Sequence, residues 1–290
     1  MMNRIALIVT AACLLAIGNQ AVAQKKAERY SVTEREKGIS EDADGVNYGI
    51  VSPDEIKKDM KCVLEYLERN TPYEVIDGKK GRHVPAGAEL NREAQLERGT
   101  FSLVDNGCGM TYSAMFTAAE LLGDDAYRDY AHNRLSFLAE VLPAFGRVYE
   151  KYGVTDSEVI QLLSPRDLDD CGTMCAAMIK ACLAEEISGA CPLVEGWVNT
   201  VMYKTTRLAD GTFSRDCPFR HTLWLDDIYK GVPALALMGA LSKYNQTKYY
   251  REALFQIGNF ADRLFVSEKG LFRHGWVEDE DASCLLLGTR

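Results

Sequence analysis

Apolar residues recur every three or four positions along most of this chain, which is the spacing of one face of an α-helix. The first such stripe follows Ser-Pro-Asp-Glu at 52–55, which has the form of a capping box with proline at the first helical position. Later stripes are separated by short polar or glycine-containing breaks. We expect helices over 53–70, 110–122, 127–138, 156–163, 172–186, 193–205, 230–243 and 246–266. A long loop that contains Gly78, Gly81 and Pro85 is expected after the first helix.

Strand-like alternation is scarce, so the pattern predicts an all-α protein. Residues 208–213 are typical of a tight turn between two short strands. The helical pattern also repeats, because 125–131 resembles 247–253, and Gly-Thr-Phe at 211–213 resembles Gly-Leu-Phe at 270–272. A single helical hairpin cannot bury its own apolar face, so such repeats predict a solenoid or a closed α/α toroid. A toroid would gather the loops of one end around a central cavity.

The first 23 residues predict a signal peptide. An arginine precedes the apolar run 5–17, which is too short to span a membrane, and Ala-Val-Ala at 21–23 resembles a cleavage site. Residues 24–50 are polar and form an expected N-terminal arm, ahead of one helical domain over 51–290. We therefore expect a secreted or periplasmic protein that is free of the membrane after cleavage. The alternative is an uncleaved segment that serves as an anchor.

Charge and cysteine spacing exclude some partners. The formal net charge is -9, which argues against nucleic acid as a ligand. Cys171, Cys175 and Cys182 have helical spacing and no histidine at zinc-ligand distance, so we interpret them as small apolar residues in a helix. No phosphate loop or metal-ligand pattern stands out, and the sequence predicts neither a cofactor nor a metal.

Acidic, basic and aromatic residues stand together at the predicted helix starts and turns. Asp105 and the pair Asp169 and Asp170 precede helices, and Asp226 stands between a tryptophan and an apolar helical run. A tryptophan offers a flat face to a sugar ring, arginine matches a carboxylate, and a partly protonated carboxyl can act as a general acid. The combination predicts a site for an acidic sugar. Its basic and aromatic members are Arg220, His221, Trp224, His274 and Trp276.

These residues also have purely structural interpretations. Aspartate is a preferred N-cap, and acids in the first turn suit the helix dipole. Capping alone would therefore account for Asp105, Asp170 and Asp226. Core packing would account for the two tryptophans, and exposed turns would account for the two histidines.

Five short motifs occur in a set order between residues 52 and 276. They are Asn-Thr-Pro-Tyr at 70–73, Asp-Asn-Gly at 105–107, Leu-Asp-Asp-Cys-Gly at 168–172, Leu-Trp-Leu-Asp-Asp at 223–227 and Leu-Phe-Arg-His-Gly-Trp at 271–276. Together they resemble glycoside hydrolase families 105 and 88, the unsaturated rhamnogalacturonyl hydrolases and unsaturated glucuronyl hydrolases.

The resemblance implies an α/α six-hairpin toroid that acts without a metal on unsaturated uronic-acid oligosaccharides left by polysaccharide lyases, as in pectin degradation. These sugars carry a C4–C5 double bond beside the carboxylate of the non-reducing end. An aspartate protonates C4 and water adds at C5, after which the hemiketal opens and the glycosidic bond is lost. By motif position, Asp226 corresponds to the acid/base, and either Asp169 or Asp170 to its partner carboxylate. Trp224 and His274 correspond to substrate contacts.

The family pattern continues to a Trp-Gly-Arg-x-Asn-Gly-Trp stretch, whereas this chain ends at Arg290. We therefore expect a toroid that is incomplete at its C-terminus. Two alternatives follow: an inactive truncated hydrolase, and a non-catalytic helical-repeat protein that binds a glycan or another protein.

The neighbours of Asp226 predict that its carboxyl is held partly in the protonated form. Asp227 is adjacent, Asp169 and Asp170 would face it across the cavity, and Trp224 would partly bury it. Like charges and burial both disfavour a carboxylate, and we expect them to outweigh a cap hydrogen bond of about 1 kcal/mol.

Overall fold

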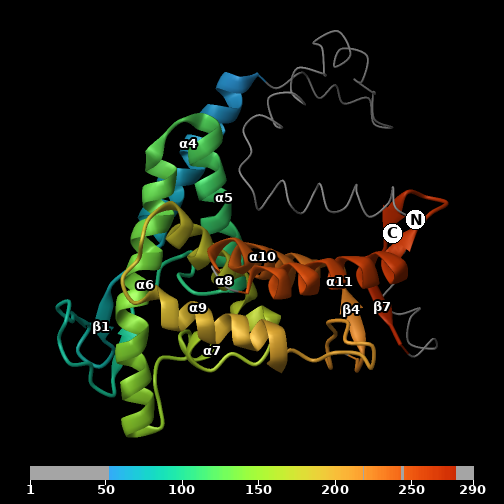
Figure 1. The fold of residues 1–290 in the computed structure, drawn as a ribbon. Coiled ribbons are helices and arrows are strands. Elements are labelled where there is room, and N and C mark those ends of the chain that lie inside the picture. Colours follow the sequence, from blue (N-terminus) through green and yellow to red (C-terminus); the bar gives the residue numbers. More distant parts are fainter. Residues whose placement is uncertain (1–51, 218, 243–244, 279–290) are drawn as a thin grey trace.

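The computed structural model describes residues 52–217, 219–242 and 245–278, and helices dominate it (Figure 1). The predicted signal peptide (1–23) and the N-terminal arm (24–50) lie outside the described residues. The helices are α4 (Pro53–Asn70), α5 (Asn106–Leu122), α6 (Asp125–Tyr152), α7 (Ile160–Leu163), α8 (Leu168–Ala184), α9 (Ala190–Asn199), the π-helical turn η1 (Thr200–Lys204), α10 (Leu225–Leu241) and α11 (Gln246–Leu264). The mostly helical structure agrees with the all-α prediction.

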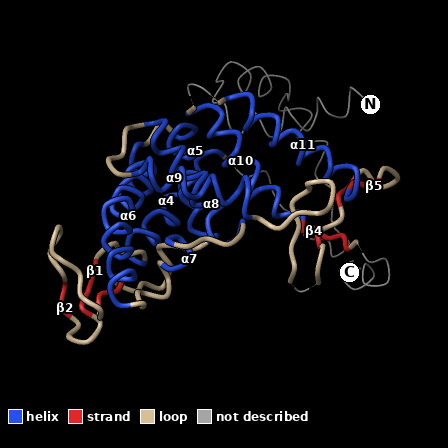
Figure 2. The backbone as a smooth tube through the Cα atoms, turned by 60° about the horizontal axis from the view of Figure 1, so that its bottom comes forward, coloured by secondary structure: helices blue, strands red, loops and turns tan. Residues whose placement is uncertain are grey.

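Three small antiparallel sheets complete the described part of the fold. The first has the order β2-β1-β3, the second pairs β4 with β7, and the third pairs β5 with β6. Figure 2 shows the first sheet and β4 at opposite ends of the molecule. The strands are β1 (Val75–Asp77), β2 (Arg82–His83), β3 (Ala94–Leu96), β4 (Thr222–Trp224), β5 (Phe265–Val266), β6 (Leu271–Phe272) and β7 (Gly275–Val277).

Helices α5, α8 and α10 pack side by side in a row, and α11 packs on the outer side of α10. Glycines allow the close approach at two crossings. A Cβ atom on Gly109 of α5 would lie 2.5 Å from the backbone nitrogen of Met174 in α8, and one on Gly172 of α8 would lie 2.6 Å from the carbonyl oxygen of Lys230 in α10. The close approach brings the first turns of α8 and α10 together.

Side-chain caps explain where the helices begin. α5 begins at Asn106 because Asp105 accepts a hydrogen bond from the backbone nitrogen of Cys108 at 2.7 Å, so the capping interpretation of Asp105 is confirmed. The N-cap of α8 is Asp167, and the capping interpretation of Asp170 is wrong. α8 and α10 therefore start four and five residues before the predicted starts at 172 and 230.

The capping interpretation of Asp226 is also wrong. The residue that precedes α10 is Trp224, which makes no side-chain cap, and Asp226 lies inside the first turn of the helix. The carboxylate of Asp226 is therefore not used by the helix backbone and is available for other contacts.

Two further predictions of secondary structure need correction. Only Ile160–Leu163 of the predicted helix 156–163 is helical, because Asp156 instead accepts a hydrogen bond from the backbone nitrogen of Leu96 at 2.7 Å. The stretch predicted as a long loop after α4 contains β1, β2 and β3. These strands have two or three residues each, which is too short for an alternating pattern to be recognised.

The helix predicted to end at 138 continues to Tyr152 as α6, and the last two residues of the predicted helix 246–266 form β5. Other local predictions agree with the structure. The two similar segments 125–131 and 247–253 both lie at the starts of long helices, α6 and α11. Gly211 and Gly270, at the two similar turns, have positive φ angles of 93° and 65°. Cys171 and Cys175 are buried in α8. None of the helices that the structure describes has both the length and the apolar character to cross a membrane.

Gly172→Ala should lower the free energy of unfolding by about 1–3 kcal/mol, because the added methyl group would press α8 away from the backbone of α10. Chemical denaturation of the two proteins measures the difference. Gly196→Ala in α9 is the matched control, since a Cβ there meets nothing within 4 Å. Equal effects of the two substitutions would show that the α8–α10 contact is not tight.

Candidate active site

Five charged side chains meet where the first turns of α8 and α10 lie side by side. Asp169 comes from α8, and Asp226, Asp227 and Lys230 come from α10. Arg215 comes from the segment before β4, where its backbone exchanges hydrogen bonds of 2.7 and 3.0 Å with Thr222. We call these five residues the charged cluster.

Arg215 joins two of the carboxylates through paired hydrogen bonds. Its Nη1 and Nη2 donate to Asp169 at 2.6 and 2.9 Å, and its Nε donates to Asp227 Oδ2 at 2.6 Å. Nη2 also donates to Asp227 Oδ1. The guanidinium is therefore fully engaged in fixing Asp169 and Asp227, and its planar fork suits this double contact.

Lys230 joins all three carboxylates. Its Nζ lies 2.5 Å from Asp226 Oδ2 and 3.5 Å from Asp227 Oδ1, and it also binds Asp169 Oδ1. The Lys230 side chain is 5% exposed. A lysine so deeply buried is stable as a cation only with such partners.

Burial and pairing shift the pKa values of the cluster in different directions. Burial raises the pKa of Asp169, but hydrogen bonds from Arg215 and Lys230 outweigh this effect and leave the pKa below its ordinary value. Burial raises the pKa of Asp227, against the opposing effect of Arg215. Burial lowers the pKa of Lys230, but hydrogen bonds to Asp169 and Asp226 outweigh it, and the result is a raised pKa.

Asp226 is the least restrained carboxylate of the cluster. Its side chain is 43% exposed, compared with 42% for Asp169 and 4% for Asp227. Its Oδ2 binds Lys230, whereas its Oδ1 is buried and makes no hydrogen bond with any residue that the structure describes, so Asp226 has the fewest hydrogen bonds of the three. The cluster has three carboxylates and two cations, so one carboxylate is in excess, and Asp226 contributes a buried oxygen that has no partner among the described residues.

Like charges are not the only neighbours of Asp226. The sequence predicts that surrounding carboxylates favour its protonated form, but the structure places the ammonium group of Lys230 against it. That prediction was incomplete, because Lys230 lies one helical turn further along α10, in a segment whose other residues are mostly apolar.

Trp224 and His274 lie beside the cluster. The guanidinium of Arg215 is 4.5 Å from the centroid of the Trp224 ring. The ring centroids of Trp224 and His274 are 5.7 Å apart. The pairing of β4 with β7 holds this arrangement, and the carbonyl oxygen of His274 accepts a hydrogen bond from the backbone nitrogen of Leu225 at 2.6 Å. Trp224 Nε1 is buried and has no hydrogen-bond partner among the described residues.

A cavity of about 530 Å³ adjoins the charged cluster. Asp169, Arg215, Trp224 and Asp227 form part of its lining, whereas Asp226 does not line it. Ser214 also lines the cavity, and its buried Oγ has no partner in the described part of the chain. Polar groups of this kind suit the hydroxyl and carboxylate groups of a sugar.

Asp169, Trp224, Asp226 and His274 are brought together, but Asp170 and Asp105 are turned to other partners. Asp170 accepts hydrogen bonds from the backbone nitrogen and Nε of Arg166 at 2.8 and 3.1 Å, so Asp169 is the member of the pair that joins the cluster. Asp105 caps α5 and forms no hydrogen bond or ion pair with the cluster's side chains.

Arg220, His221 and Trp276 also contact other residues. The Arg220 side chain is 81% exposed, with its Nε 3.9 Å from Asp216. His221 has a positive φ of 55°, and its Nδ1 lies 2.6 Å from Glu278 Oε2. The ring of Trp276 is 5.4 Å from the guanidinium of Arg263.

Sequence reasoning missed Arg215 and Lys230 and gave Asp227 only a supporting role. Lys230 can be recognised from the sequence, because it stands three residues after Asp227 and four after Asp226. Side chains at these two spacings are neighbours on a helix. Arg215 has no such signal, since its contact with Asp169 spans 46 positions of the chain.

Asp169→Asn should reduce the stability of the protein at neutral pH and should have less effect in acid. The folded-state pKa of Asp169 lies below its ordinary value of 3.8, so its pairing stabilises the fold above that pH and is lost as the pH falls through the folded value. Urea unfolding of both proteins across the acid range measures this. A difference that stays constant with pH would show that Asp169 is not ionised in the folded protein.

Comparison with known proteins shows which family this chain is similar to. The family model described as Glycosyl Hydrolase Family 88 matches residues 89–284. No curated protein matches the chain.

Two solved structures have a similar fold. One is a possible member of the GH105 family from Salmonella enterica serovar Paratyphi A, with a TM-score of 0.50 and 17% identity over 81% of this chain and 54% of that chain. The other is a possible member of the GH105 family from Klebsiella pneumoniae, with a TM-score of 0.51 and 15% identity over 83% of this chain and 56% of that chain. The chain thus spans about half the length of the structures that it matches.

Proposed function

The chain belongs to glycosyl hydrolase family 88, and we propose that it hydrates the C4–C5 double bond of an unsaturated uronyl residue at the non-reducing end of an oligosaccharide. The observation that carries this proposal is the position of Asp226. It lies in the first turn of α10 with a side chain that is 43% exposed, is bound through Oδ2 to Lys230, shares that lysine with Asp169, and has a buried Oδ1 without a partner in the described part of the chain.

Hydration of a vinyl ether needs a proton at one carbon and water at the next. Asp226 Oδ1 is buried and has no hydrogen-bond partner among the described residues, and we assign this oxygen to proton transfer at C4. The same carboxylate then assists the addition of water at C5, which forms a hemiketal. Opening of the hemiketal gives a ketone at C5 and leaves a hemiacetal at C1. Collapse of this hemiacetal to an aldehyde expels the glycosidic oxygen as an alcohol, so no nucleophile at the anomeric carbon is required.

The other members of the cluster orient Asp226. Asp169 holds Lys230, and Lys230 fixes Oδ2 of Asp226, so rotation of the carboxyl group is restricted. Asp169 is therefore the partner carboxylate that we propose for the reaction. Trp224 Nε1 and Ser214 Oγ, both buried and without partners in the described ranges, are suited to bind the sugar's hydroxyl or carboxylate groups.

We extend the proposal to architecture and location. The row of α5, α8 and α10 is assigned to the inner layer of an α/α toroid, which the repeated helical pattern and the similar fold of the GH105 structures support. The signal peptide predicted over 1–23 supports a secreted or periplasmic enzyme of polysaccharide breakdown, acting on pectin-type products.

Incubation with unsaturated disaccharides tests the activity. Loss of the absorbance of the conjugated double bond is expected with an unsaturated galacturonyl–rhamnose or an unsaturated glucuronyl disaccharide, and no cleavage is expected with the saturated forms. The disaccharide that is cleaved faster identifies the preferred uronyl residue. The alternative is a non-catalytic glycan-binding protein. It would bind both disaccharides without loss of absorbance, and Asp226→Asn would bind them with the same affinity.

A further inference from the structure

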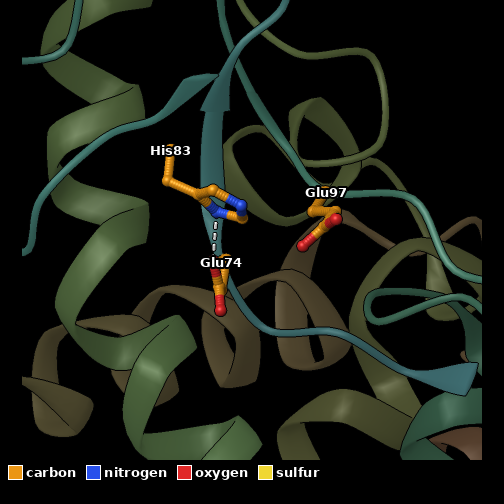
Figure 3. A group of neighbouring side chains, drawn as sticks. All are labelled: Glu74, His83 and Glu97. Atoms are coloured by element: carbon orange, nitrogen blue, oxygen red, sulfur yellow. Dashed lines mark ion pairs between the residues drawn. The ribbon is translucent and has the colours of Figure 1, made fainter. Parts of the chain in front are cut away.

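We propose a binding site for a zinc-like divalent cation on the β2-β1-β3 sheet, formed by Glu74, His83 and Glu97. The ligand atoms of these three residues all lie within 4.8 Å of one another. Figure 3 shows the three side chains grouped beside β1, with the His83 ring directed at the Glu74 carboxylate. The sheet is at the opposite end of the molecule from β4, so this site is separate from the charged cluster (Figure 2).

The strand register places the three side chains on one face. Val75 is opposite Leu96, so Glu74 is opposite Glu97, and the backbone nitrogen of Glu97 donates to the carbonyl oxygen of Glu74 at 2.9 Å. His83 is opposite Ile76, two residues along from Glu74. Residues two apart on a strand, and residues directly opposite, share a face.

The other face of the sheet packs on the protein. Val75, Asp77 and Leu96 are buried, which leaves the face with Glu74, His83 and Glu97 towards solvent. A cation could therefore reach the three ligands without any movement of the core.

The ligand set suits zinc better than calcium. Zinc accepts imidazole nitrogen and carboxylate oxygen in a tetrahedral arrangement, in which neighbouring ligand atoms are about 3.3 Å apart. The present spacing requires only small rotations of the glutamate and histidine side chains, and water would supply the fourth ligand. Calcium prefers six to eight oxygen ligands, which three residues with one nitrogen do not provide.

Charge also favours a cation here. Two glutamates directly opposite each other on a sheet repel, and a bound cation would remove this cost. His83 Nδ1 contacts Glu74 Oε2, but Glu97 forms no ion pair within the described ranges. The exposed pair His221–Glu278, by contrast, has no second carboxylate within ligand distance among the residues described.

Bound zinc would tie the two-residue edge strand β2 to β1 and to the end of β3, and so stabilise the sheet. Titration calorimetry with zinc chloride on the full chain tests the site. The thiols are first blocked with iodoacetamide, because Cys62, Cys191 and Cys217 are exposed and would bind zinc themselves. We expect one zinc per chain, a higher melting temperature with zinc, and no comparable effect of calcium.

His83→Ala and Glu97→Gln should each weaken zinc binding by at least about tenfold and abolish the rise in melting temperature, because each removes a ligand. His221→Ala is the matched control, since it removes a histidine from a similar exposed pair, and zinc binding should be unchanged. Circular dichroism confirms that the variants fold. Absence of zinc binding to the wild-type chain, or equal binding by wild type and His83→Ala, would overturn the proposal.

Discussion

Lys230→Met should destabilise the folded protein by about 3 kcal/mol at neutral pH. The substitution leaves three carboxylates in contact with a single cation, and removal of one partner from a buried ionic group typically costs about 3–5 kcal/mol. We expect the lower part of that range because Asp169 and Asp226 retain some access to water. Urea unfolding measures the change.

The loss should shrink in acid, where protonation of the carboxylates relieves their repulsion. Lys180→Met is the matched control in α8, since its half-buried Nζ binds the neutral oxygens of Ser113 and Thr117 at 3.0 and 2.7 Å. Its effect should be about 1 kcal/mol. If Lys230→Met and Lys180→Met cost the same, the ion pairs of Lys230 contribute no special stability.

Asp226→Asn should lower turnover of an unsaturated uronyl disaccharide by about 10²–10⁴-fold, which is the usual contribution of a general acid or base. Asparagine keeps the shape of the side chain but cannot transfer the proton to C4. The exposed position of Asp226 limits the change in the free energy of unfolding to about 1 kcal/mol. Steady-state kinetics and the melting temperature separate the two effects.

Asp125→Asn is the control for this experiment. Asp125 lies in the first turn of α6 and pairs with Arg128 at 2.9 Å, much as Asp226 lies in the first turn of α10 and pairs with Lys230, but it does not line the cavity. Turnover in Asp125→Asn should stay near the wild-type value. Wild-type turnover in Asp226→Asn would remove Asp226 from the mechanism, whatever the behaviour of the control.

The helical pattern predicted the helices well because helix formation depends on local spacing. The errors at the helix starts arose where polar first turns precede the apolar stripe, as at Leu168 and Leu225. The sequence contains the capping residue Asp167, but the two acids after it are equally plausible caps. Only the hydrogen bonds that Asp167 accepts from the backbone nitrogens of Asp169 and Asp170 decide between them.

The acid pairs were predicted as pairs, but not which member faces the cavity. Adjacent residues on a helix point in directions about 100° apart, so Asp169 reaches Arg215 while Asp170 reaches Arg166. Which acid faces the cavity depends on how α8 packs against α10 at Gly172. The sequence pattern of a single helix does not contain this information.

Residues outside helices were the least predictable. Arg220 and His221 have the right chemistry for an acidic sugar, yet they contact Asp216 and Glu278 on an exposed turn. Arg215, five residues earlier, takes the central position because its backbone pairs with Thr222. The zinc-like site was equally hidden, since the β2-β1-β3 pairing brings together residues that are far apart in the sequence.

The central claim is that the protein acts on the C4–C5 double bond and not at the anomeric carbon. Proton NMR of an unsaturated uronyl disaccharide during incubation with the protein tests it directly, because the vinylic H4 signal reports the double bond while other signals report release of the second sugar. The account predicts that the H4 signal disappears in step with that release. Release of the second sugar while the H4 signal stays intact would contradict the claim. The claim would also be contradicted if the H4 signal persisted and no second sugar were released.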